Sequence, residues 1–160
     1  MTADDDIIIR RAMSGDVAQL QAILHDTFAS TWQPNISDAA AAAFVREDRP
    51  AAYVGARGLL FRVAEVDGEV AGFVDWDGDF VNALHVRSSH ARMGLGRRLM
   101  NLAEAQIAGA GFASARLETD TFNARSRAFY AARSYREVDR YPDEEWDSGL
   151  TTLLLVKPLR

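Results

Sequence analysis

The residues best suited to bind an anion lie between positions 84 and 99, in the segment LHVRSSHARMGLGRRL. We expect a strand to end in this segment and a helix to begin at Gly94 and Gly96. The first turn of a helix has N–H groups without partners and carries partial positive charge. Glycines let a diphosphate approach that backbone, and arginines supply countercharge. The segment therefore predicts a site for the pyrophosphate of a large anionic cofactor.

The same two glycines have another explanation, a tight turn between strand and helix with the arginines in solvent. Both explanations stay open on these residues alone. Two nucleotide-binding motifs are disfavoured. A P-loop requires Gly-Lys-Ser/Thr at the helix start, whereas Arg97-Arg98-Leu99 follows Gly96. A Rossmann fingerprint requires a third glycine and a parallel βαβ unit, whereas the preceding segments read as hairpins.

A second group of chemically capable residues lies in the segment NARSRAFY, residues 123–130. Asn123 is a natural N-cap for a helix that follows it. Tyr130 is a possible proton donor, because a phenol with a pKa of about 10 stays protonated at neutral pH. Phe129 and Tyr130 could equally be core aromatics, with the hydroxyl satisfied at the edge of the core.

Both segments resemble motifs of the GNAT N-acetyltransferase superfamily. Residues 81–100 look like motif A, [Q/R]-x-x-G-x-[G/A], with Gly94 and Gly96 in its glycine positions; Ala91 takes the Gln/Arg position, and the neighbouring Arg92 offers a replacement. Residues 123–130 are similar to motif B, N-x-x-[SA]-x-x-[FL]-Y. Ser134-Tyr135 then departs from the usual Gly-Phe pair. The resemblance spans about residues 61–141, and two motifs in the right order are more specific than one.

The resemblance implies an α+β domain of the three-layer α/β/α type. Its mixed, mostly antiparallel central sheet would have about seven strands, a splayed parallel pair and about four helices. It also implies an acyltransferase that moves an acetyl group from acetyl-CoA to a primary amine, and a possible homodimer. A catalytically silent acyl-CoA-binding or regulatory module is the alternative.

Site residues follow from the same resemblance. Asn123 is expected to hold the pantetheine arm, and Tyr130 to protonate the departing thiolate. The remaining coenzyme contacts are expected from the strand before the loop, the loop itself and the first helical turn: Leu84, His85, Val86, Arg92, Met93, Gly94, Leu95, Gly96 and Arg97.

The general base is less clearly indicated. Asp75, Asp77 and Asp79 surround the turn before the motif A strand, and Glu118 lies on the next strand. We favour Asp79, which lies nearest the strand that reaches the site, although solvated turn residues explain the aspartates as well. His85 is a further candidate, but a histidine in a buried strand is more often structural.

Residues that could form the acceptor pocket are aromatic and acidic. The aromatic residues, most of which we expect in the core, are Phe28, Trp32, Phe44, Tyr53, Tyr141 and Trp146. The acidic run comprises Asp143, Glu144, Glu145 and Asp147. It could steer a cationic amine, although a solvated loop is the commoner explanation.

Patterning along the chain predicts the elements that must position these residues. Apolar and β-branched runs predict strands at residues 7–10, 60–66, 69–76, 80–86, 115–119, 135–141 and 150–156. Asp67-Gly68 and Asp77-Gly78 are hairpin turns that predict an antiparallel meander. Helical spacing predicts helices from Ser14 or Asp16 to Phe28, from Ser37 or Asp38 to Arg46, from the paired glycines to Gly109, and over residues 123–132. No element is predicted for residues 47–58.

Composition sets the remaining limits. The 160 residues, of which 48% are apolar and 26% charged, suit a single domain over residues 1–160. The net charge of −5 disfavours nucleic acid as a partner. Without a long apolar run or a signal core we expect no membrane association and a cytoplasmic location. The chain has no cysteine and few histidines, so no metal cofactor is expected.

Overall fold

The computed structural model of the chain describes residues 6–143 and 149–159. Seven strands form one sheet in the order β1-β2-β3-β4-β5-β7-β6. Their bounds are β1 Ile7–Arg11, β2 Arg62–Val66, β3 Glu69–Asp77, β4 Phe80–Val86, β5 Ser114–Asp120, β6 Arg136–Pro142 and β7 Thr151–Pro158. β4 and β5 run parallel, and the other neighbouring strands in the described residues run antiparallel. The sheet predicted from the sequence is confirmed.

Five α-helices accompany the sheet in the described part of the chain: α1 Val17–Thr27, α2 Asp38–Glu47, α3 Arg49–Arg57, α4 Leu95–Gly109 and α5 Ala124–Ala132. A short π-helix, η3 Phe28–Trp32, continues α1, and a short 3-10 helix, η4 Gln33–Asn35, follows it. None of the helices in the described residues is long and apolar enough to cross a membrane.

Helix α3 occupies the segment for which no element was predicted. Asp48 caps it, because its carboxylate accepts a 3.3 Å hydrogen bond from the Ala51 N–H. Pro50 lies in the first turn, where a proline costs no helical hydrogen bond. Val54 is buried against the sheet. Pro50 therefore lies at a position where a helix tolerates proline, and the helix continues past it.

The expected hairpin turns are present. Asp67 and Gly68 both have positive φ angles, 51° and 82°, as a two-residue turn of the I′ type requires. Gly78, with φ 60°, turns the chain between β3 and β4. Strands β2, β3 and β4 therefore form the antiparallel meander.

Strand β4 contains one extra residue. Asp75 of β3 pairs with Ala83, but the next residue, Trp76, pairs with Val81, so Asn82 has no partner on β3. An extra residue of this kind is a β-bulge, and it changes which face the following side chains occupy. Val81 accordingly packs into the core on one face, whereas Ala83 packs on the other.

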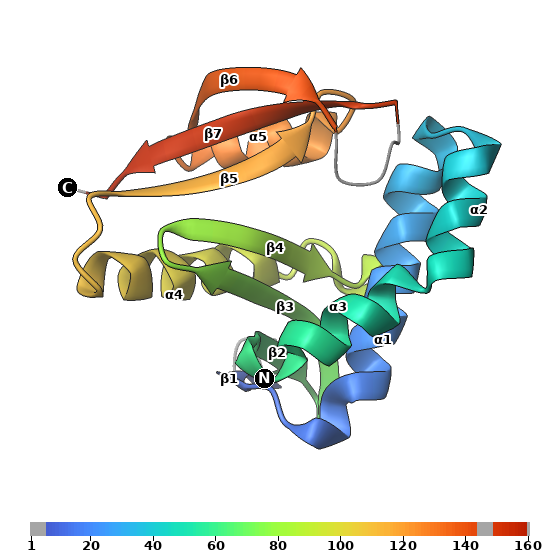
Figure 1. Cartoon of the computed structure of the whole chain (residues 1–160). Helices are drawn as coiled ribbons and strands as arrows, with labels where there is room; N and C mark the ends of the chain where they lie inside the picture. The colour runs from blue at the N-terminus through green and yellow to red at the C-terminus, as the bar shows by residue number, and fades with distance from the viewer. Residues whose placement is uncertain (1–5, 144–148, 160) are drawn as a thin grey trace.

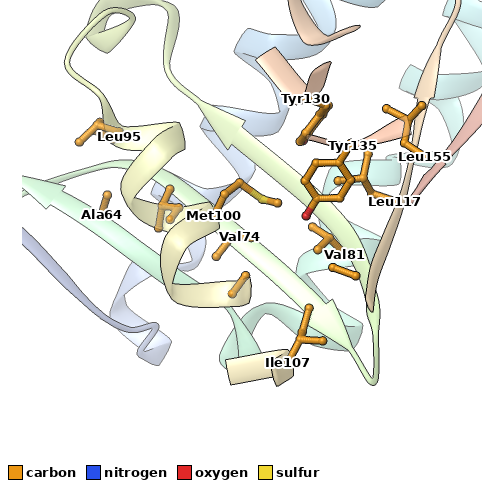
Figure 2. Close-up of a cluster of buried hydrophobic side chains, with 14 of the residues drawn as sticks. Ala64, Val74, Val81, Leu95, Met100, Ile107, Leu117, Tyr130, Tyr135 and Leu155 are labelled. Carbon is orange, nitrogen blue, oxygen red and sulfur yellow. The ribbon is translucent and has the colours of Figure 1, made fainter. Parts of the chain in front are cut away.

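The core has two parts, one on each face of the sheet. Side chains of α4 pack on one face together with Tyr130 and Tyr135 (Figure 2). Leu20 and Ile23 of α1 and Val54 of α3 pack on the other face. The three-layer α/β/α arrangement follows from these two clusters.

Strands β4 and β5 separate soon after they meet. Their register comprises two pairs, Phe80 with Arg116 and Val81 with Leu117. Beyond that point the strands diverge toward the end of the molecule where α1 and α2 lie (Figure 1). The parallel pair is therefore splayed, as expected, and its divergence begins at the β4 bulge.

Candidate active site

A large cavity occupies the space between the splayed strands. Its volume is about 1520 Å³, and its walls come from β4, β5, α1, α3, α5, η3 and the loop before α4. Residues from nearly the whole length of the chain therefore meet around one space. This space is large enough to hold an extended ligand.

The loop before α4 ends in an unusual backbone conformation. Gly94 is the N-cap of α4 and has a φ angle of 77°. Arg92 has a φ angle of 73°, a left-handed backbone conformation that residues other than glycine rarely adopt. Gly96 lines the cavity in the first turn, where helical N–H groups have no intrahelical partner. The start of α4 therefore presents donors and partial positive charge beside the cavity.

The expected loop contacts divide between two hollows. Arg92, Leu95 and Gly96 line the large cavity, whereas Arg97 lines a neighbouring hollow of about 520 Å³. Met93 packs against the α4 core. Within the described residues, no carboxylate forms an ion pair with Arg92, Arg97 or Arg98. Their charges can therefore compensate a bound anion.

The β4 wall comprises residues 80–86 and includes Leu84, His85 and Val86. The His85 Nδ1 atom lies 2.9 Å from the Thr27 hydroxyl, and its ring lies against Phe73 at 5.3 Å between centroids. Desolvation lowers the pKa of His85 to about 4, so the ring is neutral at physiological pH. A neutral imidazole with so low a pKa is a weak base.

Asn123 and Tyr130 also reach the cavity wall. Asn123 is the N-cap of α5, as predicted, and its Oδ1 accepts a 3.1 Å bond from the Ser126 N–H. Tyr130 is 8% exposed, and its ring meets those of Phe129 and Tyr135 edge-on at 5.1 and 5.5 Å between centroids. Burial raises the pKa of Tyr130, which keeps its hydroxyl protonated.

Asp79 does not share this wall. Its carboxylate accepts two 2.9 Å bonds from Arg116, and this ion pair lowers its pKa. Asp79 is not among the residues that line the cavity, although Asp77 is. The structure therefore brings Tyr130, Asn123 and the β4 backbone together and leaves Asp79 outside the group.

Two carboxylates of β5 line the cavity on the side of α1. Asp120, absent from the predicted residues, accepts a 2.9 Å bond from the Trp32 indole, and desolvation raises its pKa. Glu118 accepts a hydrogen bond from the Tyr141 hydroxyl, and burial with this bond raises the pKa of Tyr141 to about 12. Their alternation along β5 could have indicated this shared face, but the sequence does not reveal the Trp32 contact.

Comparison with known proteins identifies the fold and the family. The sequence profile of the acetyltransferase (GNAT) family matches residues 17–135. The chain belongs to this family. An uncharacterized N-acetyltransferase from the pepI 3′ region of Lactobacillus delbrueckii subsp. lactis is 28% identical over 160 residues, covering 90% of this chain and 92% of that protein.

Solved structures share the GNAT fold. A GCN5-related N-acetyltransferase from Rhodopseudomonas palustris superposes with a TM-score of 0.79 at 20% identity over 94% of each chain. YncA from Salmonella typhimurium, solved with its cofactor acetyl-CoA, gives a TM-score of 0.69 at 21% identity over 97% of this chain and 95% of that one.

In this GNAT domain most of the expected aromatic residues line the cavity. Those that line it are Phe28, Trp32, Phe44, Tyr53 and Tyr141. Phe28 and Phe44 stack at 3.6 Å between centroids, which joins α2 to η3. Asp143 also lines the cavity, whereas Trp146, Glu144, Glu145 and Asp147 lie outside the described residues. In the described ranges, no three His, Asp or Glu side chains gather as metal ligands would.

Proposed function

We propose that this GNAT domain transfers an acetyl group from acetyl-CoA to a primary amine. One observation carries the proposal: Tyr130, the β4 wall and the first turn of α4 all line the same cavity. YncA, which shares the fold, binds acetyl-CoA as its cofactor. That likeness supports the same donor here.

The coenzyme would lie along the cavity in an extended form. The first turn of α4 would hold the diphosphate, with Arg92 supplying countercharge. The pantetheine arm would continue between the splayed strands, where the backbone of residues 84–86 does not pair with β5. Asn123 would contact the same arm from the start of α5. This placement directs the thioester toward Tyr130.

The transfer forms a C–N and an S–H bond and breaks a C–S and an N–H bond. The amine nitrogen attacks the thioester carbonyl, a C–N bond forms, and the C–S bond breaks. Tyr130 gives its proton to the departing thiolate; its raised pKa keeps the hydroxyl protonated until that step. Tyr130 regains a proton from the nitrogen through solvent, so that the products are the amide and free coenzyme A.

A carboxylate must first take a proton from the ammonium form of the acceptor. We assign this role to Asp120, because its desolvated carboxylate is a stronger base than an exposed one. Glu118, on the same face of β5, is exposed and can pass the proton to solvent. The negative charges of both residues also attract a cationic amine.

Thiol release from acetyl-CoA tests this function. The purified protein is incubated with acetyl-CoA and a panel of polyamines, amino acids, aminoglycosides and peptide N-termini. We expect amine-dependent release of coenzyme A with at least one class, and mass spectrometry should find an acetylated product. Coenzyme binding by calorimetry without turnover on any amine would instead support a silent acyl-CoA-binding module.

A further inference from the structure

The carboxylate of Asp75 is fully buried and accepts four hydrogen bonds. Arg57 donates two of them, at 2.7 and 3.0 Å, and the Tyr53 hydroxyl donates one at 2.7 Å. The fourth comes from the Asn82 amide at 3.1 Å. The donors lie on α3 and β4, whereas Asp75 lies on β3. One carboxylate therefore joins three elements.

The fourth bond reaches the one β4 residue that has no partner on β3. Asn82 is the bulge residue, so the ladder between β3 and β4 does not fix its conformation. Its side-chain bond to Asp75 supplies that missing constraint. Arg57 adds a 3.3 Å bond to the Trp76 carbonyl, directly beside the bulge. The bulge is thus bonded to β3, and α3 in turn bonds the β3 residues opposite it.

The position of the bulge matters for the cavity. β4 separates from β5 after Val81, and both the bulge residue Asn82 and residues 83–86, which follow it, line the cavity. Without the extra residue, the alternation of β4 would place His85 on the face that Val81 occupies. Tyr53 and Arg57 of α3 line the same cavity. The same carboxylate thus sets the spacing between the α3 wall and the β4 wall.

We propose that Asp75 is a positioning residue for acetyl-CoA: it fixes the β4 bulge through Asn82 and holds α3 through Arg57. The proposal rests on the proposed function, in which the β4 backbone binds the pantetheine arm. Asp75 takes no part in proton transfer, because its oxygens are occupied by these four bonds.

Asp16 provides a matched control. It is also a buried carboxylate, 5% exposed, and it accepts bonds of 2.8 and 2.9 Å from Arg10 and one of 2.7 Å from the Met13 N–H. Neither Asp16 nor Arg10 lines the cavity. Loss of either carboxylate destabilises the fold, but only loss of Asp75 releases the bulge.

The experiment compares Asp75→Asn, Asn82→Ala and Asp16→Asn with the unmodified protein. Calorimetry gives the Kd for coenzyme A, steady-state kinetics give KM for acetyl-CoA and kcat, and thermal unfolding gives Tm. We expect Asp75→Asn and Asp16→Asn to lower Tm alike. Asp75→Asn and Asn82→Ala should raise Kd and KM by about tenfold, because small displacements of a binding group cost much of its contribution.

Asp16→Asn should leave Kd and KM unchanged. An unchanged Kd in Asn82→Ala and Asp75→Asn overturns the proposal, as does an equal rise in Asp16→Asn. Should Asp75→Asn fail to fold, Asn82→Ala decides, because the exposed Asn82 can be changed without burying an unpaired charge. If the unmodified protein binds no coenzyme A, the proposed function fails instead.

Discussion

The Trp32 indole donates a 2.9 Å hydrogen bond to the carboxylate of Asp120, 88 positions further along the chain. Trp32 is the last residue of the short π-helix η3, which continues α1, and Asp120 is the last residue of β5. The bond therefore joins the helical end of the molecule to the half of the sheet beyond the splay. It also orients the carboxylate that we propose as the base.

Replacing Asp120 should affect catalysis more than replacing Glu118. Asp120→Asn removes the proposed base, and we expect kcat/KM to fall by about 100-fold. Glu118→Gln should cause a smaller loss, because an exposed proton relay is replaced by water. Thiol-release kinetics across pH measure both. Equal losses in the two variants, or no loss in Asp120→Asn, would assign the base elsewhere.

Asp120 should also make folding stability depend on pH. Burial raises its pKa in the folded state, so its protonated form favours folding. This contribution is fully present below the unfolded value of about 3.9 and is lost as pH rises through the folded pKa. We expect the unfolding free energy of the wild type, relative to that of Asp120→Asn, to decrease as the pH rises from the unfolded pKa of Asp120 to its folded pKa. Denaturant unfolding at several pH values measures it.

Tyr130→Phe should slow chemistry without weakening coenzyme binding. The ring keeps its contacts with Phe129 and Tyr135, so the fold and Kd should not change. Loss of a general acid should lower kcat by about 100-fold. Tyr135→Phe is the control: it loses the 2.9 Å bond to Glu104, and with it about 1 kcal/mol of stability, but should keep kcat. Full activity in Tyr130→Phe would contradict the assignment.

The two glycines at the start of α4 should respond differently to alanine. Gly94→Ala places a side chain at φ 77°, which costs about 1 kcal/mol. A Cβ at Gly96 would meet Phe129 Cζ at 3.5 Å, an ordinary contact, so Gly96→Ala should keep Tm. Because Gly96 lines the cavity, the added methyl should raise the Kd for coenzyme A. Thermal unfolding and calorimetry separate the two effects, and tight binding by Gly96→Ala would argue against the diphosphate site.

Asp79→Asn should leave kcat unchanged and alter stability slightly. Arg116 lowers the pKa of Asp79, so the ion pair stabilises the fold above about pH 4 and loses this effect as pH falls. The pair is partly exposed, and its contribution should not exceed about 1 kcal/mol. Kinetics and denaturant unfolding near neutral pH check both statements. A large drop in kcat would restore Asp79 as the base.

Local signals explain why much of the fold could be predicted from the sequence. Asp67-Gly68 fixes a hairpin, Asn123 and Ser37 each cap a helix through their own side chain, and Gly94 marks the start of α4. Each of these depends on residues within a few positions. The strand and helix boundaries near them were therefore predicted to within a few residues.

Contacts between distant residues account for what the sequence did not reveal. Helix α3 depends on the bonds of Arg57 to Asp75 as well as on its own propensity. The β4 bulge depends on pairing with β3, and neither Asn82 nor its neighbours mark it. The environment of Asp120 depends on Trp32. The sequence therefore predicted the start of α4 and the N-cap of α5 more readily than the surroundings of Asp120.

The short register between β4 and β5 implies that the protein unfolds in parts. Strands β1–β4 and β5–β7 share two backbone pairs, so side-chain packing of α4, Tyr130 and Tyr135 carries most of the connection between them. Amide hydrogen exchange should then show two blocks with different opening free energies. A ligand that bridges the blocks would protect both at once, and slower exchange on β4 and β5 together would report its occupancy.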